Sequence, residues 1–77
     1  MQKAPLSVAL GRAIRAAREK LGWSQEELAA EADLHRTYVG SLERGERNIT
    51  VLSLARIAKA LGVRASTLLA EAESHRR

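Results

Sequence analysis

Apolar and polar positions alternate along the first part of the chain with the period of an α-helix. The apolar stripe consists of Leu10, Ile14, Ala17 and Leu21. Arg12 and Arg15 fall on the opposite side of the same helical wheel. This pattern predicts an amphipathic helix over residues 8–21, with Ser7 as its N-terminal cap and Gly22 as its stop.

A short polar segment then begins a second helix, predicted over residues 25–32. Ser24 is followed three residues later by Glu27, the spacing at which two side chains cap a helix reciprocally. This helix lasts only two turns before Asp33, which tolerates a left-handed backbone better than most residues that carry a side chain. We therefore predict a tight turn near residues 33–35.

The same signals predict three further helices. They span residues 36–44, 51–61 and 65–73. His35 starts the first of them, Thr50 caps the second, and Gly45 and Gly62 stop them. The C-terminal SHRR is expected to fray. The chain is therefore predicted to be all-α, with five short helices.

The helix over residues 36–44 has two different faces. The inward positions of this helix, the preceding helix and the turn between them are Leu28, Ala29, Ala32, Leu34, Val39 and Leu42. Thr37, Ser41 and Arg44 point away from them. Gly40 lies beside this outer face, where a close approach by another surface would explain a residue that costs up to roughly 1 kcal/mol against Ala. Arg36 opposes the helix dipole, which favours an external partner over helix stability as its explanation.

Two helices joined in this way form a helix-turn-helix, and the outer face carries donors suited to base edges and phosphates in a major groove. Residues 24–63, SQEELAAEADLHRTYVGSLERGERNITVLSLARIAKALGV, closely resemble the Cro and phage-repressor type of helix-turn-helix domain, the xenobiotic response element family. The segment LHRTYVGSLERGERNIT is especially similar to the controller proteins of restriction-modification systems. The resemblance implies one five-helix, lambda-repressor-like DNA-binding domain over residues 1–77, with the helix-turn-helix at about 25–44.

The chain departs from the family pattern at the turn and before the fifth helix. The family usually has Gly where Asp33 stands, and commonly Ser or Thr where His35 and Arg64 stand. These departures predict a turn and a helix start that are less ideally capped, within the same fold.

The resemblance also implies which residues contact DNA. Gln25 would contact a backbone phosphate, which the free N–H groups at the start of its helix also favour. The residues implied to face bases or nearby phosphates are Arg36, Thr37, Tyr38 and Ser41. The residues implied to contact the flanking DNA backbone are Arg44, Arg47, Asn48 and Ser53. A buried ion pair between Arg18 and Glu43 is implied as well, and helical wheels place both residues beside the core.

Simpler interpretations of the same residues remain open. The arginines could form a solvated basic surface, Tyr38 could pack against the second helix, and Gln25 could be an ordinary first-turn residue.

The last two helices carry more apolar residues than a small core obviously needs. These residues are Leu52, Leu61, Val63, Leu68 and Leu69. Some of them could be pure core, but a self-complementary patch over residues 51–73 would give the twofold homodimer that the resemblance implies. The helices over residues 36–44 of the two copies would then lie about 34 Å apart, on successive major grooves of a pseudo-palindromic operator.

Composition narrows the function. With 77 residues the chain is sized for one domain, and with 3% aromatic residues and no Phe its core must be aliphatic. It has no Cys, which fits a reducing interior and excludes thiolate metal sites. It also has no apolar run of the roughly 18 residues that a membrane-spanning helix needs. Thirteen basic against nine acidic residues leave 13 − 9 = +4, a balance that favours polyanionic partners.

Candidate catalytic or metal-binding groups are scattered. His35 and His75 are far apart, and the acidic side chains form no pair suited to acid–base chemistry. We therefore expect no cofactor, no metal and no enzymatic activity.

The hypothesis from sequence is a sequence-specific DNA-binding transcriptional regulator, of the restriction-modification controller kind, in the cytoplasm and associated with the nucleoid. Its expected partners are double-stranded DNA, a second copy of the chain and RNA polymerase. The alternative is an antitoxin-like interaction module that neutralises a toxin and regulates its own synthesis. Such proteins usually carry an added toxin-binding segment, for which the four residues of SHRR leave little room. A peripheral membrane protein is less favoured, because the basic and apolar positions are spread over five short helices.

Overall fold

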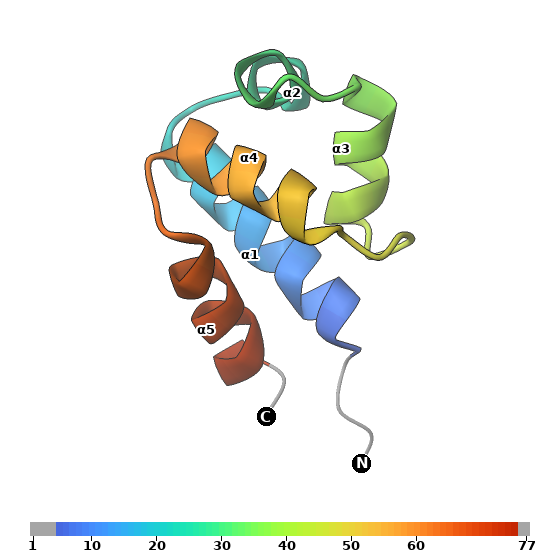
Figure 1. Ribbon diagram of the computed structural model, residues 1–77, viewed down its shortest axis with the longest axis vertical. Helices are drawn as coiled ribbons and strands as arrows, with labels where there is room; N and C mark the ends of the chain where they lie inside the picture. Colours follow the sequence, from blue (N-terminus) through green and yellow to red (C-terminus); the bar gives the residue numbers. More distant parts are fainter. Residues whose placement is uncertain (1–4, 76–77) are drawn as a thin grey trace.

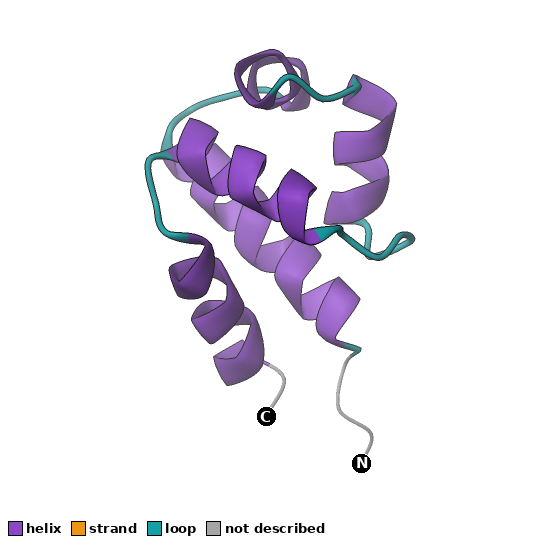
Figure 2. Cartoon of the chain, viewed as in Figure 1, coloured by secondary structure: helices purple, strands orange, loops and turns teal. Residues whose placement is uncertain are grey.

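The computed structural model describes residues 5–75, and the described chain is built from five helices and the loops between them (Figures 1 and 2). The helices are α1 (Leu6–Lys20), α2 (Gln25–Ala32), α3 (Arg36–Glu43), α4 (Val51–Leu61) and α5 (Ala65–His75). Within residues 5–75 no strand is formed. The predicted all-α, five-helix fold is thus confirmed.

The longest helix, α1, lies at the centre and packs against α3, α4 and α5 (Figure 1). The short α2 lies across one end of the molecule, against α3 and α4. This arrangement leaves α3 at one side, with α5 on the opposite side of α1 and α4.

The core is aliphatic, as the composition requires. Its largest fully buried side chains are Ile14, Leu28, Val39, Ile57 and Leu68. Burying each side chain of this size contributes about 1.5–3 kcal/mol to the free energy of unfolding. Leu34, expected to point inward, is only half-buried and packs at the edge of this cluster.

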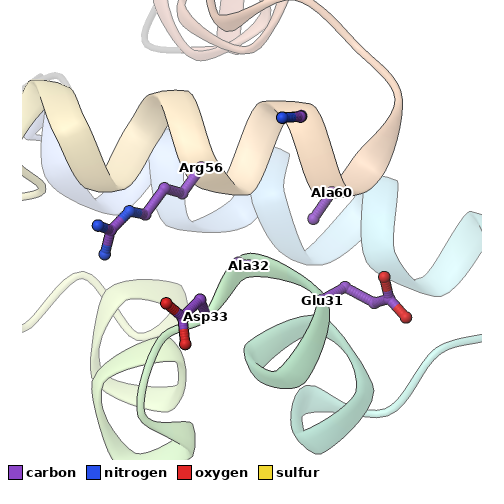
Figure 3. A pocket seen from close by; sticks show the side chains of 6 residues that line it. Glu31, Ala32, Asp33, Arg56 and Ala60 are labelled. Atoms are coloured by element: carbon purple, nitrogen blue, oxygen red, sulfur yellow. The ribbon is translucent and has the colours of Figure 1, made fainter.

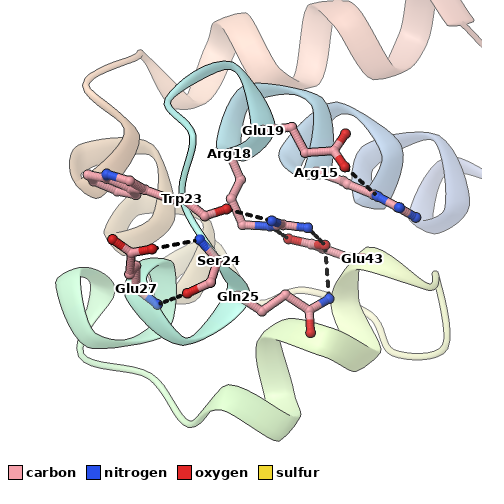
Figure 4. Close-up of polar contacts among 8 residues, drawn as sticks. All are labelled: Arg15, Arg18, Glu19, Trp23, Ser24, Gln25, Glu27 and Glu43. Carbon is pink, nitrogen blue, oxygen red and sulfur yellow. Dashed lines mark hydrogen bonds and ion pairs between the residues drawn. The ribbon is translucent and has the colours of Figure 1, made fainter.

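Local capping defines the start of α2 as predicted. The Glu27 N–H donates to Ser24 Oγ at 3.1 Å, and the Ser24 N–H donates to the Glu27 carboxylate at 3.0 Å (Figure 4). Thr50 caps α4 in the same way, because its hydroxyl accepts the Ser53 N–H at 3.0 Å. Each cap satisfies backbone donors that would otherwise lack a partner within the helix.

Both ends of the described chain differ from the prediction. The helix α1 starts at Leu6 with Pro5 in the capping position, so Ser7 lies inside the helix and is not its cap. The Pro5 carbonyl accepts the N–H groups of Val8 at 3.0 Å and Ala9 at 3.1 Å, which begins the helical hydrogen bonds ahead of Ser7. At the other end, α5 continues through His75 because Ala72 is buried in the core, whereas residues 76–77 of the predicted frayed tail lie outside the described residues.

Helix α1 approaches α3 very closely at Gly11. A Cβ atom at this position would lie 2.8 Å from the carbonyl oxygen of Glu43 and closer still to that of Leu42. Backbone atoms cannot move away as the end of a flexible side chain can. Glycine is therefore the residue that lets α1 cross the C-terminal end of α3 at this distance.

A buried ion pair joins the same two helices, as the sequence led us to expect. Arg18 Nε and Nη2 donate to the two carboxylate oxygens of Glu43 at 2.7 and 2.9 Å, and Arg18 Nη1 donates to the Trp23 carbonyl at 2.7 Å (Figure 4). The side chains are only 11% and 2% exposed. Hydrogen bonding to Glu43 raises the pKa of Arg18 above its ordinary value, although burial acts in the opposite direction. The guanidinium thus ties α1 to α3 and to the loop before α2.

Replacing Glu43 with Ala should leave the Arg18 charge buried without its partner, because no other carboxylate among the described residues pairs with it. We expect Glu43→Ala to lower the free energy of unfolding by about 3–5 kcal/mol, measured by urea denaturation. The matched control is Glu19→Ala, which removes the exposed i,i+4 pair with Arg15 and should change it by no more than about 0.5 kcal/mol. Equal stability of the Glu43→Ala variant and the unaltered protein would contradict a structural role for the pair.

Candidate nucleic-acid interface

The turn between α2 and α3 has the geometry of a helix-turn-helix despite its unusual residues. Asp33 adopts the left-handed conformation, with φ 55°, and ends α2. The Leu34 N–H then returns to the Ala29 carbonyl at 2.9 Å. His35 starts α3 by accepting the Thr37 N–H on Nδ1 at 3.3 Å. Asp33 and His35 therefore perform the turn and cap functions that the family usually gives to Gly and to Ser or Thr.

The predicted DNA-contacting residues divide into an exposed group, the half-buried Gln25 and Tyr38, and the buried Ser41 and Ser53. Those exposed at the surface are Arg36, Thr37, Arg44, Arg47 and Asn48. They come from α3 and from the loop that follows it, at the side of the molecule where α3 lies (Figure 1). A continuous stretch of chain thus brings three arginines, a hydroxyl and an amide to one side.

Two arginines of this group have weak ion pairs. Arg36 Nε lies 3.8 Å from Glu26 Oε1, and Arg44 Nε lies 3.0 Å from Glu46 Oε1, with all four side chains more than half exposed. Exposed pairs of this kind are worth about 0–1 kcal/mol, so an anionic ligand can replace the carboxylates. Within residues 5–75, Arg47 forms no ion pair with a carboxylate.

Ser41 does not point outward as its wheel position suggested. It is only 7% exposed, and its hydroxyl donates to the Tyr38 carbonyl at 2.9 Å. The chain after α3 folds back, so that the Glu46 N–H donates to the Ser41 carbonyl at 3.0 Å. The expected outward position of Ser41 is therefore wrong, because a helical wheel does not include this returning loop.

Ser53 is also buried, although it was expected to reach the DNA backbone. It is 9% exposed, and its Oγ accepts hydrogen bonds from the hydroxyls of Thr50 at 2.9 Å and Tyr38 at 3.2 Å. These hydrogen bonds join the start of α4 to α3. Ser53 therefore has a structural role behind the exposed residues of α3 and the following loop.

The side chain of Tyr38, on α3, lies between α4 and the loop that follows α3. Its hydroxyl donates to Ser53, and the guanidinium carbon of Arg47 lies 5.2 Å from the centre of its ring. These contacts run toward α4 and the loop, whereas packing against the second helix was the alternative from sequence.

The side chain of Gln25, at the first position of α2, is hydrogen-bonded to a buried carboxylate. Its Nε2 donates to Glu43 Oε1 at 3.1 Å, so the amide is attached to the buried ion pair (Figure 4). Gly40 lies beneath it, since a Cβ there would be 3.4 Å from Gln25 Oε1 and 3.2 Å from Arg44 Nη1. Within the protein, Gly40 is therefore covered by the ends of two flexible side chains, and the close approach by another surface stays a prediction.

The predicted dimer residues are only partly at the surface. Leu61 and Leu68 are 6% and 1% exposed, and both belong to the core, so their assignment to an interface is wrong. Val63 and Leu69 are half-buried. Leu52 is 63% exposed, and the neighbouring Val51, which the prediction omitted, is 87% exposed. A count of apolar residues could not distinguish buried from exposed positions, because neighbouring apolar residues of α4 and α5 lie partly in the core and partly at the surface.

An apolar hollow adjoins these exposed residues, between the start of α1, the start of α4 and α5. Its apolar lining consists of Leu6, Leu10, Ile49, Val51, Leu54 and Leu69. Leu6 on its rim is 37% exposed. With Val51 and Leu52 beside it, this hollow is the candidate surface for contact with a second copy.

A second hollow lies between the end of α2 and α4 (Figure 3). Its charged lining consists of Glu31 and Asp33 on one side and Arg56 and Lys59 on the other. Among the described residues, no ion pair joins the two sides. Balanced opposite charges of this kind do not select a ligand of one sign.

Within residues 5–75, no group of three His, Cys, Asp or Glu side chains is arranged to hold a metal ion. None of the described helices combines the length and the apolar character needed to cross a membrane.

Comparison with known proteins gives consistent matches. A family model described as helix-turn-helix matches residues 14–68. The control protein C.BamHI of Bacillus amyloliquefaciens is 48% identical over 60 residues, which are 77% of this chain and 74% of that protein. The control protein C.SmaI of Serratia marcescens is 47% identical over 60 residues, covering 78% of this chain and 71% of that protein.

Solved structures agree with these matches. The clp gene regulator ClgR from C. glutamicum has a TM-score of 0.92 at 32% identity, covering 97% of this chain and 96% of that chain. The restriction-modification controller protein C.Esp1396I, solved as a tetramer with its natural 35 base-pair operator, has a TM-score of 0.83 at 32% identity, covering 95% and 96%. On its own helix-turn-helix geometry and on these matches, the chain belongs to the helix-turn-helix family of the xenobiotic response element type.

Proposed function

We propose that this protein is a transcriptional regulator that binds operator DNA as a homodimer, and that it acts as a restriction-modification controller. The observation that carries the proposal is the exposed cationic surface formed by α3 and the following loop, on a helix-turn-helix anchored to the core. The names of the relatives, control proteins and a controller solved with its operator, support the controller assignment.

In this proposal α3 enters the major groove. Arg36 and Thr37, at its exposed start, face base edges, where arginine can donate two hydrogen bonds to guanine. Arg44, Arg47 and Asn48 hold the phosphates beside the groove. Gln25 contributes to the same backbone contacts from the start of α2, where free N–H groups favour an anion. The buried Ser41 and Ser53 are left out of this contact surface.

We further propose that the dimer forms through the exposed apolar patch. Val51 and Leu52 are exposed to solvent at the start of α4, beside the hollow that Leu6 and Leu69 help to line. A second copy that covers both would remove this apolar area from water, the dominant favourable term in association. A twofold arrangement would present two α3 helices at a spacing of about 34 Å.

The dimer would act at a promoter, where RNA polymerase is the partner whose access or recruitment it changes. Association with the nucleoid would follow from DNA binding itself. The named control proteins among the relatives favour this regulator over the antitoxin-like alternative.

Binding to duplex DNA is the direct test of the proposal. If each dimer contacts six to ten phosphates, affinity should fall by roughly 10³–10⁵ between 50 and 200 mM salt, because condensed counterions are released on binding. Mobility shift with a mixed-sequence duplex at the two salt concentrations measures this fall. No shift at either concentration would contradict the proposed function.

Removing Arg36 should change sequence preference. Arg36→Ala is expected to weaken binding to a preferred duplex by about 1–3 kcal/mol while changing affinity for mixed-sequence DNA much less. Competition titrations with both duplexes measure the difference. Arg64→Ala is the charge-matched control, since this exposed residue belongs to the loop before α5, and that loop lies on the opposite side of the molecule from α3 (Figure 1). Equal losses on both duplexes would remove Arg36 from base reading.

A charge in the apolar patch should prevent dimerisation. Leu52→Glu places a carboxylate where the second copy would bury it, at little cost to a fold in which Leu52 is 63% exposed. Sedimentation equilibrium should show a dimer for the unaltered protein and a monomer for this variant. Leu21→Glu, at a leucine that is 47% exposed beyond the end of α1, should remain dimeric. A dimer that persists in Leu52→Glu would place the interface elsewhere.

A further inference from the structure

We infer that Tyr38 is a positioning residue that acts on DNA through Arg47, and that it reads no base itself. Its ring is a shelf that holds the Arg47 guanidinium toward a backbone phosphate. The inference rests on the proposed function, and it changes the role that family resemblance alone gives to Tyr38.

Arg47 is held without being neutralised. Its guanidinium carbon lies 5.2 Å from the centre of the Tyr38 ring, a distance at which the ring face attracts a cation. Within residues 5–75 it has no carboxylate partner, whereas Arg36 and Arg44 each lie beside one. The ring face attracts the cation without adding a negative charge that would neutralise it. The positive charge of Arg47 therefore stays available for a phosphate.

The shelf is itself fixed at its hydroxyl end. The Tyr38 hydroxyl donates to Ser53 Oγ at 3.2 Å, while the backbone carbonyl of Tyr38 accepts the Ser41 hydroxyl at 2.9 Å. Ser53 is held in turn by Thr50, whose hydroxyl donates to it at 2.9 Å. The ring is thus fastened between α3 and the cap of α4, and its single O–H donor is already used inside the protein.

This arrangement prepares the loop after α3 for binding. Arg47 belongs to an exposed loop, where a long side chain would otherwise lose much rotamer freedom on contacting DNA. Contact with a fixed ring removes part of that freedom before DNA arrives. Because phosphates carry no direct sequence information, the benefit should be the same on every duplex.

The test is a double-mutant cycle between Tyr38→Leu and Arg47→Ala, with Tyr38→Phe as the variant that keeps the ring. Affinity is measured for a duplex selected from a random library and for a mixed-sequence duplex. Tyr38→Leu should lose about two- to fivefold on both duplexes, the range expected for an exposed cation–π contact. Tyr38→Phe should stay within about twofold of the unaltered protein. In the Arg47→Ala background, Tyr38→Leu should cause no further loss.

Three results would overturn the inference. An equal loss from Tyr38→Leu with and without Arg47 would mean that Tyr38 acts independently. A loss confined to the selected duplex would make Tyr38 a base-reading residue. A loss of more than about fivefold in Tyr38→Phe would assign the role to the hydroxyl, and this variant decides the matter if thermal melting shows that Tyr38→Leu does not fold.

A measurement without DNA separates the shelf from the proposed function. In NMR spectra of the free protein, the Arg47 δ-protons should be shifted upfield by the ring in the unaltered protein and in Tyr38→Phe, and this shift should disappear in Tyr38→Leu. Shifts that are insensitive to Tyr38→Leu would reject the shelf. Failure of the unaltered protein to bind any duplex, with the ring-induced shift present, would instead reject the proposed function.

Discussion

The hydrogen-bonded ion pair between Arg18 and Glu43 is the interaction on which the rest of the structure depends. Two buried charges are favourable only when each is fully paired, and here Arg18 meets both Glu43 oxygens and the Trp23 carbonyl. The same carboxylate accepts the amide of Gln25. One buried group therefore sets the positions of α1, the start of α2 and the end of α3. Gly11 allows the close crossing that brings the two charges together.

This anchoring explains how so small a domain can present a rigid surface. The exposed residues of the candidate interface, Arg36 and Arg44 among them, have only weak or solvated contacts of their own. Their backbone, by contrast, is fixed by the capped turn before α3 and by the hydroxyls that join Tyr38 to the start of α4. Exposed cationic side chains on a fixed backbone suit a polyanion, because attraction to phosphate needs charge and binding in register needs a scaffold.

Sequence predicted what local chemistry determines. The capping box at Ser24, the left-handed turn at Asp33 and the bounds of α2 and α4 follow from side chains that interact within a few residues, and all are found in the structure. The wrong cap at Ser7 was a local error, because Pro5 takes that position. The other errors arise where packing beyond the helix decides the outcome. A helical wheel gave Ser41 an outward direction but could not show the loop that returns over it. A count of apolar residues could not identify Leu68 as core, because that depends on how α5 packs against α1.

The most direct test of the account is selection of bound duplexes from a random library by the unaltered protein. Two α3 helices related by a twofold axis should enrich a pseudo-palindromic site whose half-sites are centred about 10 base pairs, or a multiple of that, apart. Enrichment of such a site would agree with the proposed dimeric regulator. Recovery of no preferred sequence, or of a single half-site without symmetry, would contradict it.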